Sequence, residues 1–151
     1  MTSDTINPAA CNCLALRQAA RHVSQFYDRF LASCGLRTTQ YSILARLQRR
    51  GPMTINALAG ELVMDRTTLG RNILPLQRDG LIEVGPGKTD RRSKELRLSQ
   101  SGAARFAAAV KVWGEAQARF EAEFGIKRAK ELRAVLHEIA TNERTGTLAA
   151  T

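Results

Sequence analysis

The chain has 151 residues, with 23 Lys and Arg against 14 Asp and Glu, which gives a formal net charge of +9 at pH 7. This length is typical of one domain with a single core, and a hydrophobic content of 44% excludes a disordered tail. No apolar run approaches the roughly 20 residues of a membrane span, no secretory signal opens the chain, and three cysteines argue against a disulfide framework. We therefore expect a cytoplasmic protein with no membrane partner, whose large partner is a polyanion.

The first part of the chain predicts two amphipathic helices. Apolar residues recur at three- and four-residue steps over 9–33, which indicates a long helix with one buried face. Thr38 or Thr39 is expected to cap the second helix, and Gly51-Pro52 ends it.

Two shorter helices are expected next. Thr54 caps the first of them, and the second begins near Asp65 and runs to Asp79, with Gly80 just past its end. Pro75 interrupts the second pattern, because proline has no backbone N–H and crowds the preceding turn. We therefore expect a kink or an early end at that position.

After position 80 the spacing of apolar residues changes from that of a helix to alternation, and after position 100 it returns to that of a helix. Apolar and polar residues alternate over 81–84 and 94–98, around a connection rich in Gly, Pro and Asp, which predicts a β-hairpin. A long helix opens at Ser101-Gly102, Gly125 interrupts it, and a final helix follows. This order predicts a mainly α (α+β) fold: a winged helix-turn-helix with long terminal helices and a small β-hairpin wing.

The expected organisation is one domain with two functions. Residues 37–100 form the winged helix-turn-helix lobe, and residues 9–36 and 101–144 form dimerisation helices. The terminal helices have apolar stripes that a domain of this size cannot cover alone. Packing against the same helices of a second copy covers them, so we expect a homodimer.

Basic residues cluster in two segments of the middle third. Three arginines lie within 66–78 with no acid between them, and five basic residues lie within 88–97 beside two acids. A clustered basic stripe is what contact with phosphates requires. The alternative, an ordinary solvated surface, stays open for Arg78, Lys94 and Arg97.

Three motifs in this region resemble the MarR family of bacterial transcription regulators. They are the helix-turn-helix segment 54–82, the turn Asp90-Arg91-Arg92-Ser93-Lys94, and the pattern of Leu, Ser and Gly over 96–102. The resemblance extends over about residues 14–139. It implies the winged-helix fold, a homodimer, double-stranded DNA as the partner and no cofactor.

The resemblance and the side-chain chemistry together predict the DNA contacts. A recognition helix presents short polar and basic side chains at its N-terminal end, and a wing places an arginine beside the minor groove. The expected DNA-binding residues are Thr54, Asp65, Arg66, Thr67, Thr68, Arg71, Arg91, Arg92 and Lys94. Asp90 is expected to orient the wing by pairing with one of its arginines. Turn formation is the alternative for Asp90, and helix capping is the alternative for Thr54.

Many MarR-family members are released from DNA by a small aromatic compound that binds between the dimer helices and the DNA-binding lobe. The resemblance implies such an effector pocket here, walled by His22, Phe26, Tyr27, Tyr41 and Trp113. The alternative is that these residues belong to the core, with Trp113 at the dimer interface and His22 a hydrogen-bonded polar neighbour.

Cys11 and Cys13 are candidate redox residues. The OhrR-type peroxide sensors of the family have a reactive cysteine at a place that Cys13 resembles, and Tyr27 falls where one of their two activating tyrosines lies. The other tyrosine position is Thr38, where this sequence departs from the pattern. An inert buried cysteine is the alternative, and no metal site is expected, because the cysteine spacing matches no familiar zinc site.

The sequence therefore predicts a transcription regulator and not an enzyme, since it has no Gly-x-x-x-x-Gly-Lys, His-Glu-x-x-His or Gly-x-Ser-x-Gly motif. We expect a homodimeric repressor, acting in a stress response, that binds a pseudo-palindromic operator. A small molecule or an oxidative signal is expected to release it. The alternatives are an OhrR-like cysteine redox sensor and a non-specific architectural DNA binder.

Overall fold

The computed structural model describes residues 7–142. Most of the described chain is helical and one small antiparallel sheet accompanies the helices, which confirms the expected mainly α fold. The elements in chain order are η2 (Pro8–Ala10), α1 (Asn12–Leu31), η3 (Ala32–Cys34), α2 (Thr38–Arg50), β1 (Met53–Thr54), α3 (Ile55–Leu62), α4 (Arg66–Arg78), β2 (Ile82–Pro86), β3 (Lys94–Leu98), α5 (Gln100–Phe124) and α6 (Ile126–Thr141). The last two residues of the range 101–144 lie outside the described residues.

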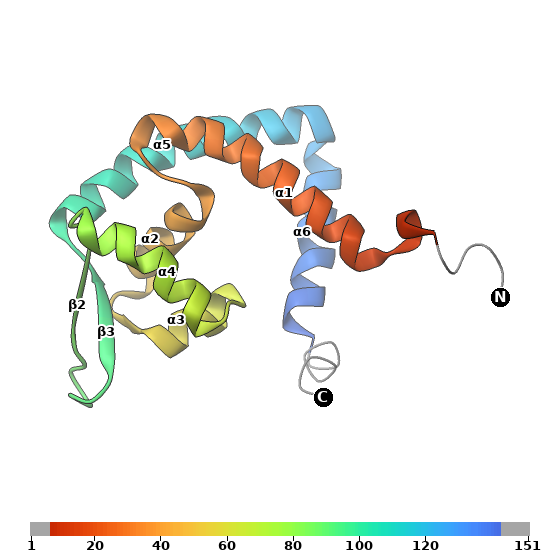
Figure 1. The fold of residues 1–151 in the computed structure, drawn as a ribbon. Coiled ribbons are helices and arrows are strands. Elements are labelled where there is room, and N and C mark those ends of the chain that lie inside the picture. Colours follow the sequence, from red (N-terminus) through yellow and green to blue (C-terminus); the bar gives the residue numbers. More distant parts are fainter. Residues whose placement is uncertain (1–6, 143–151) are drawn as a thin grey trace.

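The terminal helices form a frame, and the middle of the chain forms a lobe beside it (Figure 1). Helices α1 and α5 pack along each other, and α6 leaves the end of α5 at a steep angle. Gly125 makes this bend with φ 103° and ψ 128°, a conformation that glycine adopts readily. Helices α2 to α4 and the β2–β3 hairpin lie at the other end of α5, and the hairpin extends away from the helices.

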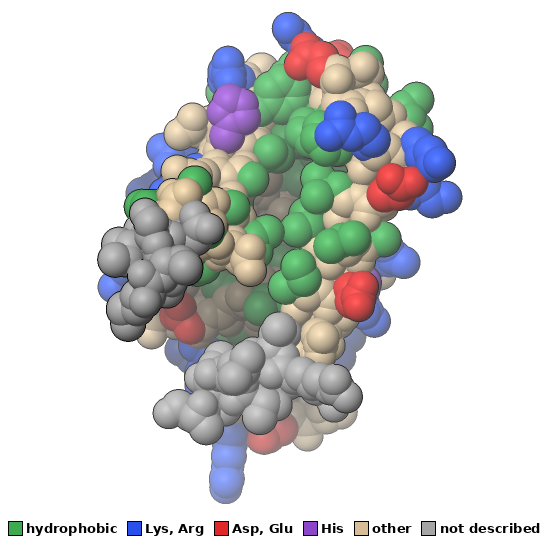
Figure 2. Space-filling model, turned by 90° about the vertical axis from the view of Figure 1, so that its right-hand side faces the viewer, with side chains coloured by type: hydrophobic (Ala, Val, Ile, Leu, Met, Phe, Trp, Pro, Cys, Tyr) green, Lys and Arg blue, Asp and Glu red, His purple; other side chains and the backbone are tan. Residues whose placement is uncertain are grey.

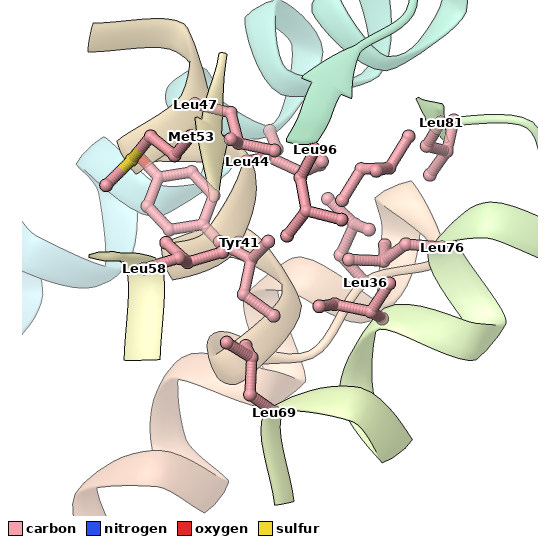
Figure 3. Packing of buried hydrophobic residues seen from close by; sticks show 14 of the residues in the cluster. Leu36, Tyr41, Leu44, Leu47, Met53, Leu58, Leu69, Leu76, Leu81 and Leu96 are labelled. Atoms are coloured by element: carbon pink, nitrogen blue, oxygen red, sulfur yellow. The ribbon is translucent and has the colours of Figure 1, made fainter. Parts of the chain in front are cut away.

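Leucine and isoleucine side chains make up most of the core of the lobe. Figure 3 shows side chains from α2, α3, α4 and β3 converging on one cluster. Its largest fully buried members are Leu31, Ile43, Leu44, Leu58, Leu69, Leu76, Ile82 and Leu96. Burial of each such side chain stabilises the fold by about 1.5–3 kcal/mol, so this cluster fixes where α4 lies.

The sheet has three strands rather than the two of the expected hairpin. Its order is β1-β3-β2, and both pairings are antiparallel. In register, Leu96 of β3 lies opposite Val84 on one side and Met53 on the other. Strand β1 has two residues, which is too short for an alternating pattern to reveal it.

The start of α2 differs from the expected capping by threonine. Thr38 is the first residue of the helix, and its N–H and hydroxyl both donate to Asp28 Oδ1 of α1 at 2.7 Å. Gln40 Oε1 instead accepts from the N–H of Arg37, the residue before the helix, at 3.0 Å. Thr38 therefore joins α2 to α1, because the Asp28 carboxylate lies within hydrogen-bonding distance of it.

A kink or an early end was expected at Pro75, and the early end was wrong, because helix α4 runs through Pro75 to Arg78. Pro75 costs the helix one backbone hydrogen bond, but the residues on either side hold the last turn in place. Ile73 and Leu76 are 4% and 0% exposed, and the Pro75 carbonyl accepts from Asp79 N–H at 3.0 Å. Tertiary packing outweighs the local preference here.

A tight corner joins the end of α4 to the start of α5. Ser99, the residue before α5, accepts from Gly102 N–H at 2.9 Å and donates through its own N–H to the Leu81 carbonyl at 3.0 Å. The hydroxyls of Ser99 and Ser101 both donate to the Gly80 carbonyl. The lobe is thereby fastened to the long helix.

The frame leaves apolar side chains on its surface. Those exposed by more than a third on α1, α5 and α6 are Leu16, Val110, Ile126, Leu132, Val135, Leu136 and Ile139. None of the helices in residues 7–142 combines the length and apolar character that crossing a membrane requires. These side chains are available to another protein surface.

Candidate nucleic-acid interface

Helices α3 and α4 start with side-chain caps and are joined by a short turn. Thr54 Oγ1 accepts from Ala57 N–H at 3.1 Å, which confirms that Thr54 caps α3. Asp65 is the residue before α4. Between the helices, Val63 has φ 51° and ψ 50°, a left-handed conformation that is rare for a β-branched residue.

Asp65 and Thr68 form a closed pair at the start of α4. Asp65 Oδ1 accepts from Thr68 N–H at 2.8 Å, and Oδ2 accepts from the Thr68 hydroxyl at 2.7 Å. These bonds, first the backbone one and then the hydroxyl one, hold the pKa of Asp65 below its usual value. The carboxylate is thus fixed in its charged form as a helix cap, and the Thr68 hydroxyl is already in use.

Three side chains in the first two turns of α4 are exposed and unpaired. Arg66, Thr67 and Arg71 form no side-chain hydrogen bond or ion pair with the part of the chain that the structure describes. Thr67 and Arg71 lie on the face of α4 away from Leu69 and Ile73, and Arg66 is the first residue of the helix, ahead of that buried face. This face can therefore accept a partner without breaking any contact inside the chain.

The tip of the wing is a turn shaped by Asp90. Asp90 Oδ1 accepts from the backbone N–H of Arg92 at 3.0 Å, and the Asp90 carbonyl accepts from the Ser93 hydroxyl at 2.8 Å. Among residues 7–142, Asp90 forms no ion pair with Arg91 or Arg92, so the expected pairing was wrong. The carboxylate reaches a backbone N–H two residues along, which is the usual short-range partner of aspartate in a turn.

The basic residues of the wing fall into two kinds. Arg91, Arg92 and Lys94 are exposed, and their side chains have no hydrogen-bond or ion-pair partner within the described residues. Arg97 is different, because its Nη2 donates to Glu95 Oε2 at 3.3 Å and to the Pro86 carbonyl at 3.4 Å. Three side chains are therefore free for a polyanion, while Arg97 holds the two strands together.

A large crevice lies between the frame and the lobe. Its volume is about 1260 Å³, and its walls come from α1, α2, α5 and α6. Figure 2 shows this hollow with hydrophobic side chains along both edges. Tyr27, Tyr41 and Trp113 line it, and Tyr41 stacks on Trp113 with ring centres 5.8 Å apart.

The structure does not place His22 or Phe26 on the crevice. Both lie on other faces of α1: His22 is exposed, and the Phe26 ring packs against Phe30 at 5.3 Å. Sequence reasoning also missed α6, which contributes Leu132 and Leu136 to the crevice. The sequence pattern of α6 shows an apolar stripe but not which element it faces.

A chain of polar contacts borders the crevice. The Tyr27 hydroxyl donates to Gln117 Oε1, Gln117 Nε2 donates to Glu121 Oε1 at 3.0 Å, and Arg133 Nη1 donates to the same oxygen at 3.0 Å. Burial and the Glu121 carboxylate raise the pKa of Tyr27, while Arg133 lowers it. These residues link α1, α5 and α6, and nothing in their sequence spacing indicated the contact.

The cysteines near the start of α1 are accessible. Cys11 and Cys13 are exposed, and Cys11 Sγ accepts from Leu14 N–H at 3.4 Å as the cap of the helix. Neither is the inert buried cysteine that was the alternative. Across residues 7–142, no three His, Cys, Asp or Glu side chains come together as a metal site would need.

A model of the MarR family matches residues 36–94, from the residues just before α2 to the start of β3. The M. tuberculosis transcriptional regulator MosR, solved in complex with DNA, is 35% identical to this chain with a TM-score of 0.79. That match covers 89% of this chain and 96% of MosR. The chain belongs to the MarR family of transcription regulators.

Two other relatives of this MarR-family chain are informative about regulation. The transcriptional repressor CouR, bound to a 23-mer DNA duplex, is 25% identical with a TM-score of 0.78, and the match covers 87% of this chain and 94% of CouR. The transcriptional activatory protein BadR of Rhodopseudomonas palustris is 32% identical over 90 residues, which is 58% of this chain and 51% of BadR. The chain thus matches about half of BadR's length, and its relatives include a repressor and an activator by name.

Proposed function

We propose that this MarR-family chain binds double-stranded DNA sequence-specifically to regulate transcription. The observation that supports this most strongly is a set of four exposed arginines, Arg66, Arg71, Arg91 and Arg92. Their side chains have no hydrogen-bond or ion-pair partner among residues 7–142. In a chain of net charge +9, such a surface is suited to phosphates, which release counterions when arginines neutralise them. The DNA complexes of MosR and CouR support the same function.

Helix α4 enters the major groove in this proposal, and the wing reaches the minor groove. Arg66 or Arg71 can form two parallel hydrogen bonds to guanine, and the methyl groups of Thr67 and Thr68 can contact thymine. Thr68 contributes its methyl because its hydroxyl already donates to Asp65.

The first turn of α3 adds a phosphate contact, where Thr54 caps the helix and free N–H groups face outward. At the wing, Arg91 or Arg92 enters a narrow A·T-rich minor groove, and Lys94 contacts the backbone. Asp90 holds the turn that presents the two arginines.

The protein acts as a homodimer in this proposal. The apolar side chains exposed on α1, α5 and α6 support pairing through the terminal helices, which would remove them from water. Residues 9–36 and 101–144 are then the dimerisation helices, and residues 37–100 the DNA-binding lobe. A two-fold dimer places its recognition helices about 34–36 Å apart and so binds a pseudo-palindrome, and an operator that overlaps a promoter gives repression.

Fluorescence anisotropy of the reduced protein on its own upstream DNA, with excess random duplex as competitor, tests this function. We expect Arg91→Ala and Arg92→Ala each to weaken binding by about 1–3 kcal/mol. Lys127→Ala is the matched control, because Lys127 is 89% exposed on α6 and pairs only along its own helix with Glu131. Unchanged affinity in both arginine variants would remove the wing from the interface, and equal competition by random DNA would indicate an architectural binder.

Two observations support a signal that releases the protein from DNA. The part of the crevice lined by Tyr27, Tyr41 and Trp113 has the apolar, aromatic walls of a site for a small aromatic effector, and the exposed leucines of α1 and α6 that line the rest are among those that the proposed dimer covers. The exposure of Cys11 and Cys13 supports an oxidative signal instead. In that case a hydroperoxide oxidises the Cys13 thiol to a sulfenic acid and leaves as the alcohol.

Cys13→Ser separates the two signals. We expect the variant to bind DNA as the wild type does under reducing conditions, because Cys13 lies far along the chain from α4 and the wing. If the variant alone loses release by a hydroperoxide, the cysteine is the sensor. If both proteins ignore the hydroperoxide, the crevice is the remaining site for a signal.

A further inference from the structure

Leu74 is a large apolar side chain that α4 leaves in solvent. It is 64% exposed, although the same helix buries Leu69, Ile73 and Leu76. At 3.6 residues per turn, position 74 lies nearly opposite position 76 and almost in line with position 67. Leu74 therefore points directly away from the core, in the direction of Thr67.

Leu74 differs in position from most other exposed apolar side chains. Among the large hydrophobic residues exposed by more than a third within residues 7–142, all but Leu74 and Val63 lie on the terminal helices. The proposed homodimer covers that frame. Val63 lies in the turn before α4, so Leu74 is the one on the helix proposed to read DNA.

The neighbours of Leu74 give this face an apolar strip with a cationic edge. Thr67 presents a methyl group two turns earlier, and Gly70 lies between them with no atom within 4 Å of where a Cβ would be. Neither a positive φ nor crowding requires glycine at position 70. Its missing side chain leaves room for an incoming surface between Thr67 and Leu74, and the unpaired Arg71 flanks that room.

We propose that Leu74 contacts the C5-methyl group of a thymine in each half-site of the operator. The inference rests on the proposed DNA-binding function and adds a specificity residue to it. In the major groove, base pairs present hydrogen-bonding groups that leucine cannot satisfy, and the thymine methyl is the apolar exception. Contact between the two removes apolar surface of both from water.

The helix geometry also places this thymine within the half-site. Leu74 lies three residues after Arg71, a rise of about 4.5 Å along α4. Successive base pairs are about 3.4 Å apart. The thymine that Leu74 contacts therefore lies within one or two base-pair steps of the base that Arg71 contacts.

The test replaces single thymines by deoxyuridine, which lacks only the C5-methyl group. A tight-binding duplex is first selected from a random library, and each thymine of a half-site is then replaced in turn, with the symmetric position of the other half-site. Affinities are measured by anisotropy for the wild type and for Leu74→Ala. Gln77→Ala is the control, because Gln77 is exposed on α4 one turn after Leu74 and has a polar end group, so the same truncation there removes no apolar partner of a methyl group.

At one thymine position we expect deoxyuridine to weaken wild-type binding about fourfold for each methyl group lost. The same replacement should leave Leu74→Ala unaffected and should weaken Gln77→Ala as it weakens the wild type. If the protein binds a specific sequence but deoxyuridine weakens the wild type and Leu74→Ala equally at every thymine position, this inference is overturned and the proposed function still stands. Failure of selection to yield any preferred duplex overturns the proposed function itself.

Discussion

The corner between α4 and α5 gives a sharp test of how the lobe is attached to the frame. A Cβ at Gly102 would lie 2.0 Å from the Leu81 carbonyl oxygen and 2.9 Å from Leu98 Cδ1. Optimal contact between non-bonded atoms is about 3.5 Å or more. Gly102→Ala must therefore push the start of α5 away from the corner by roughly 1.5 Å.

The magnitude follows from the bonds that this movement breaks. Three hydrogen bonds cross the corner: Ser99 N–H to Leu81, and the hydroxyls of Ser99 and Ser101 to Gly80. At about 0.5–1.5 kcal/mol each, their loss costs about 1.5–4.5 kcal/mol. Alanine returns about 1 kcal/mol through its helix propensity, which leaves a net destabilisation of about 0.5–3.5 kcal/mol.

Urea unfolding followed by circular dichroism, at a fixed protein concentration, measures this loss. Gly70→Ala is the matched control, because it makes the same substitution in a helix where no atom lies within 4 Å of the new Cβ. We expect that control to gain about 1 kcal/mol. If Gly102→Ala were as stable as Gly70→Ala, the corner would not be the rigid joint inferred here.

Three further predictions concern stability. Val63→Asn should raise the free energy of unfolding by about 1 kcal/mol, because asparagine tolerates the left-handed conformation that Val63 adopts, and urea unfolding measures it. The lowered pKa of Asp65 adds stability that is present above its unfolded-state pKa and is lost as the pH falls through the folded-state value. In Asp65→Asn the free energy of unfolding should therefore depend less on pH in the acid range. Burial raises the pKa of Tyr41, so stability should fall as the pH rises above about 10, and Tyr41→Phe should lessen that fall in alkaline unfolding curves.

Local signals were sufficient to predict the helix-turn-helix and the wing. Asp65 and Gly80 mark the two ends of α4 in the sequence. The alternation of apolar and polar residues on either side of the Gly-Pro-Gly turn predicted the hairpin. These features depend on residues a few positions apart, so their physical causes are visible in the sequence. Pro75 shows the limit of this reasoning, since distant leucines keep α4 intact beyond it.

Contacts between distant segments could not be predicted in the same way. The partner of Thr38 is Asp28, the partner of β1 is β3, and the ion pair of Arg133 is with Glu121. Each depends on how two elements lie in space, which neither periodicity nor capping specifies. The same reason explains why the crevice residues of α6 were missed while Tyr41, on α2, was found.

The two ends of α5 are attached in different ways, and this difference bears on the proposed release from DNA by a signal. At its start, α5 is fastened to the end of α4 by the corner at Gly102, so lobe and helix must move together. At its other end, α5 is joined to α6 through Gly125 and through the Arg133–Glu121 ion pair. This ion pair is partly exposed to solvent, so it contributes less to stability than the hydrogen bonds of the corner. In the proposed mechanism, a molecule that enters the crevice would therefore shift α6 against α5 before it distorts α4. In the proposed dimer such a shift changes the distance between the two recognition helices, and affinity falls because two undistorted lobes no longer match the spacing of the half-sites.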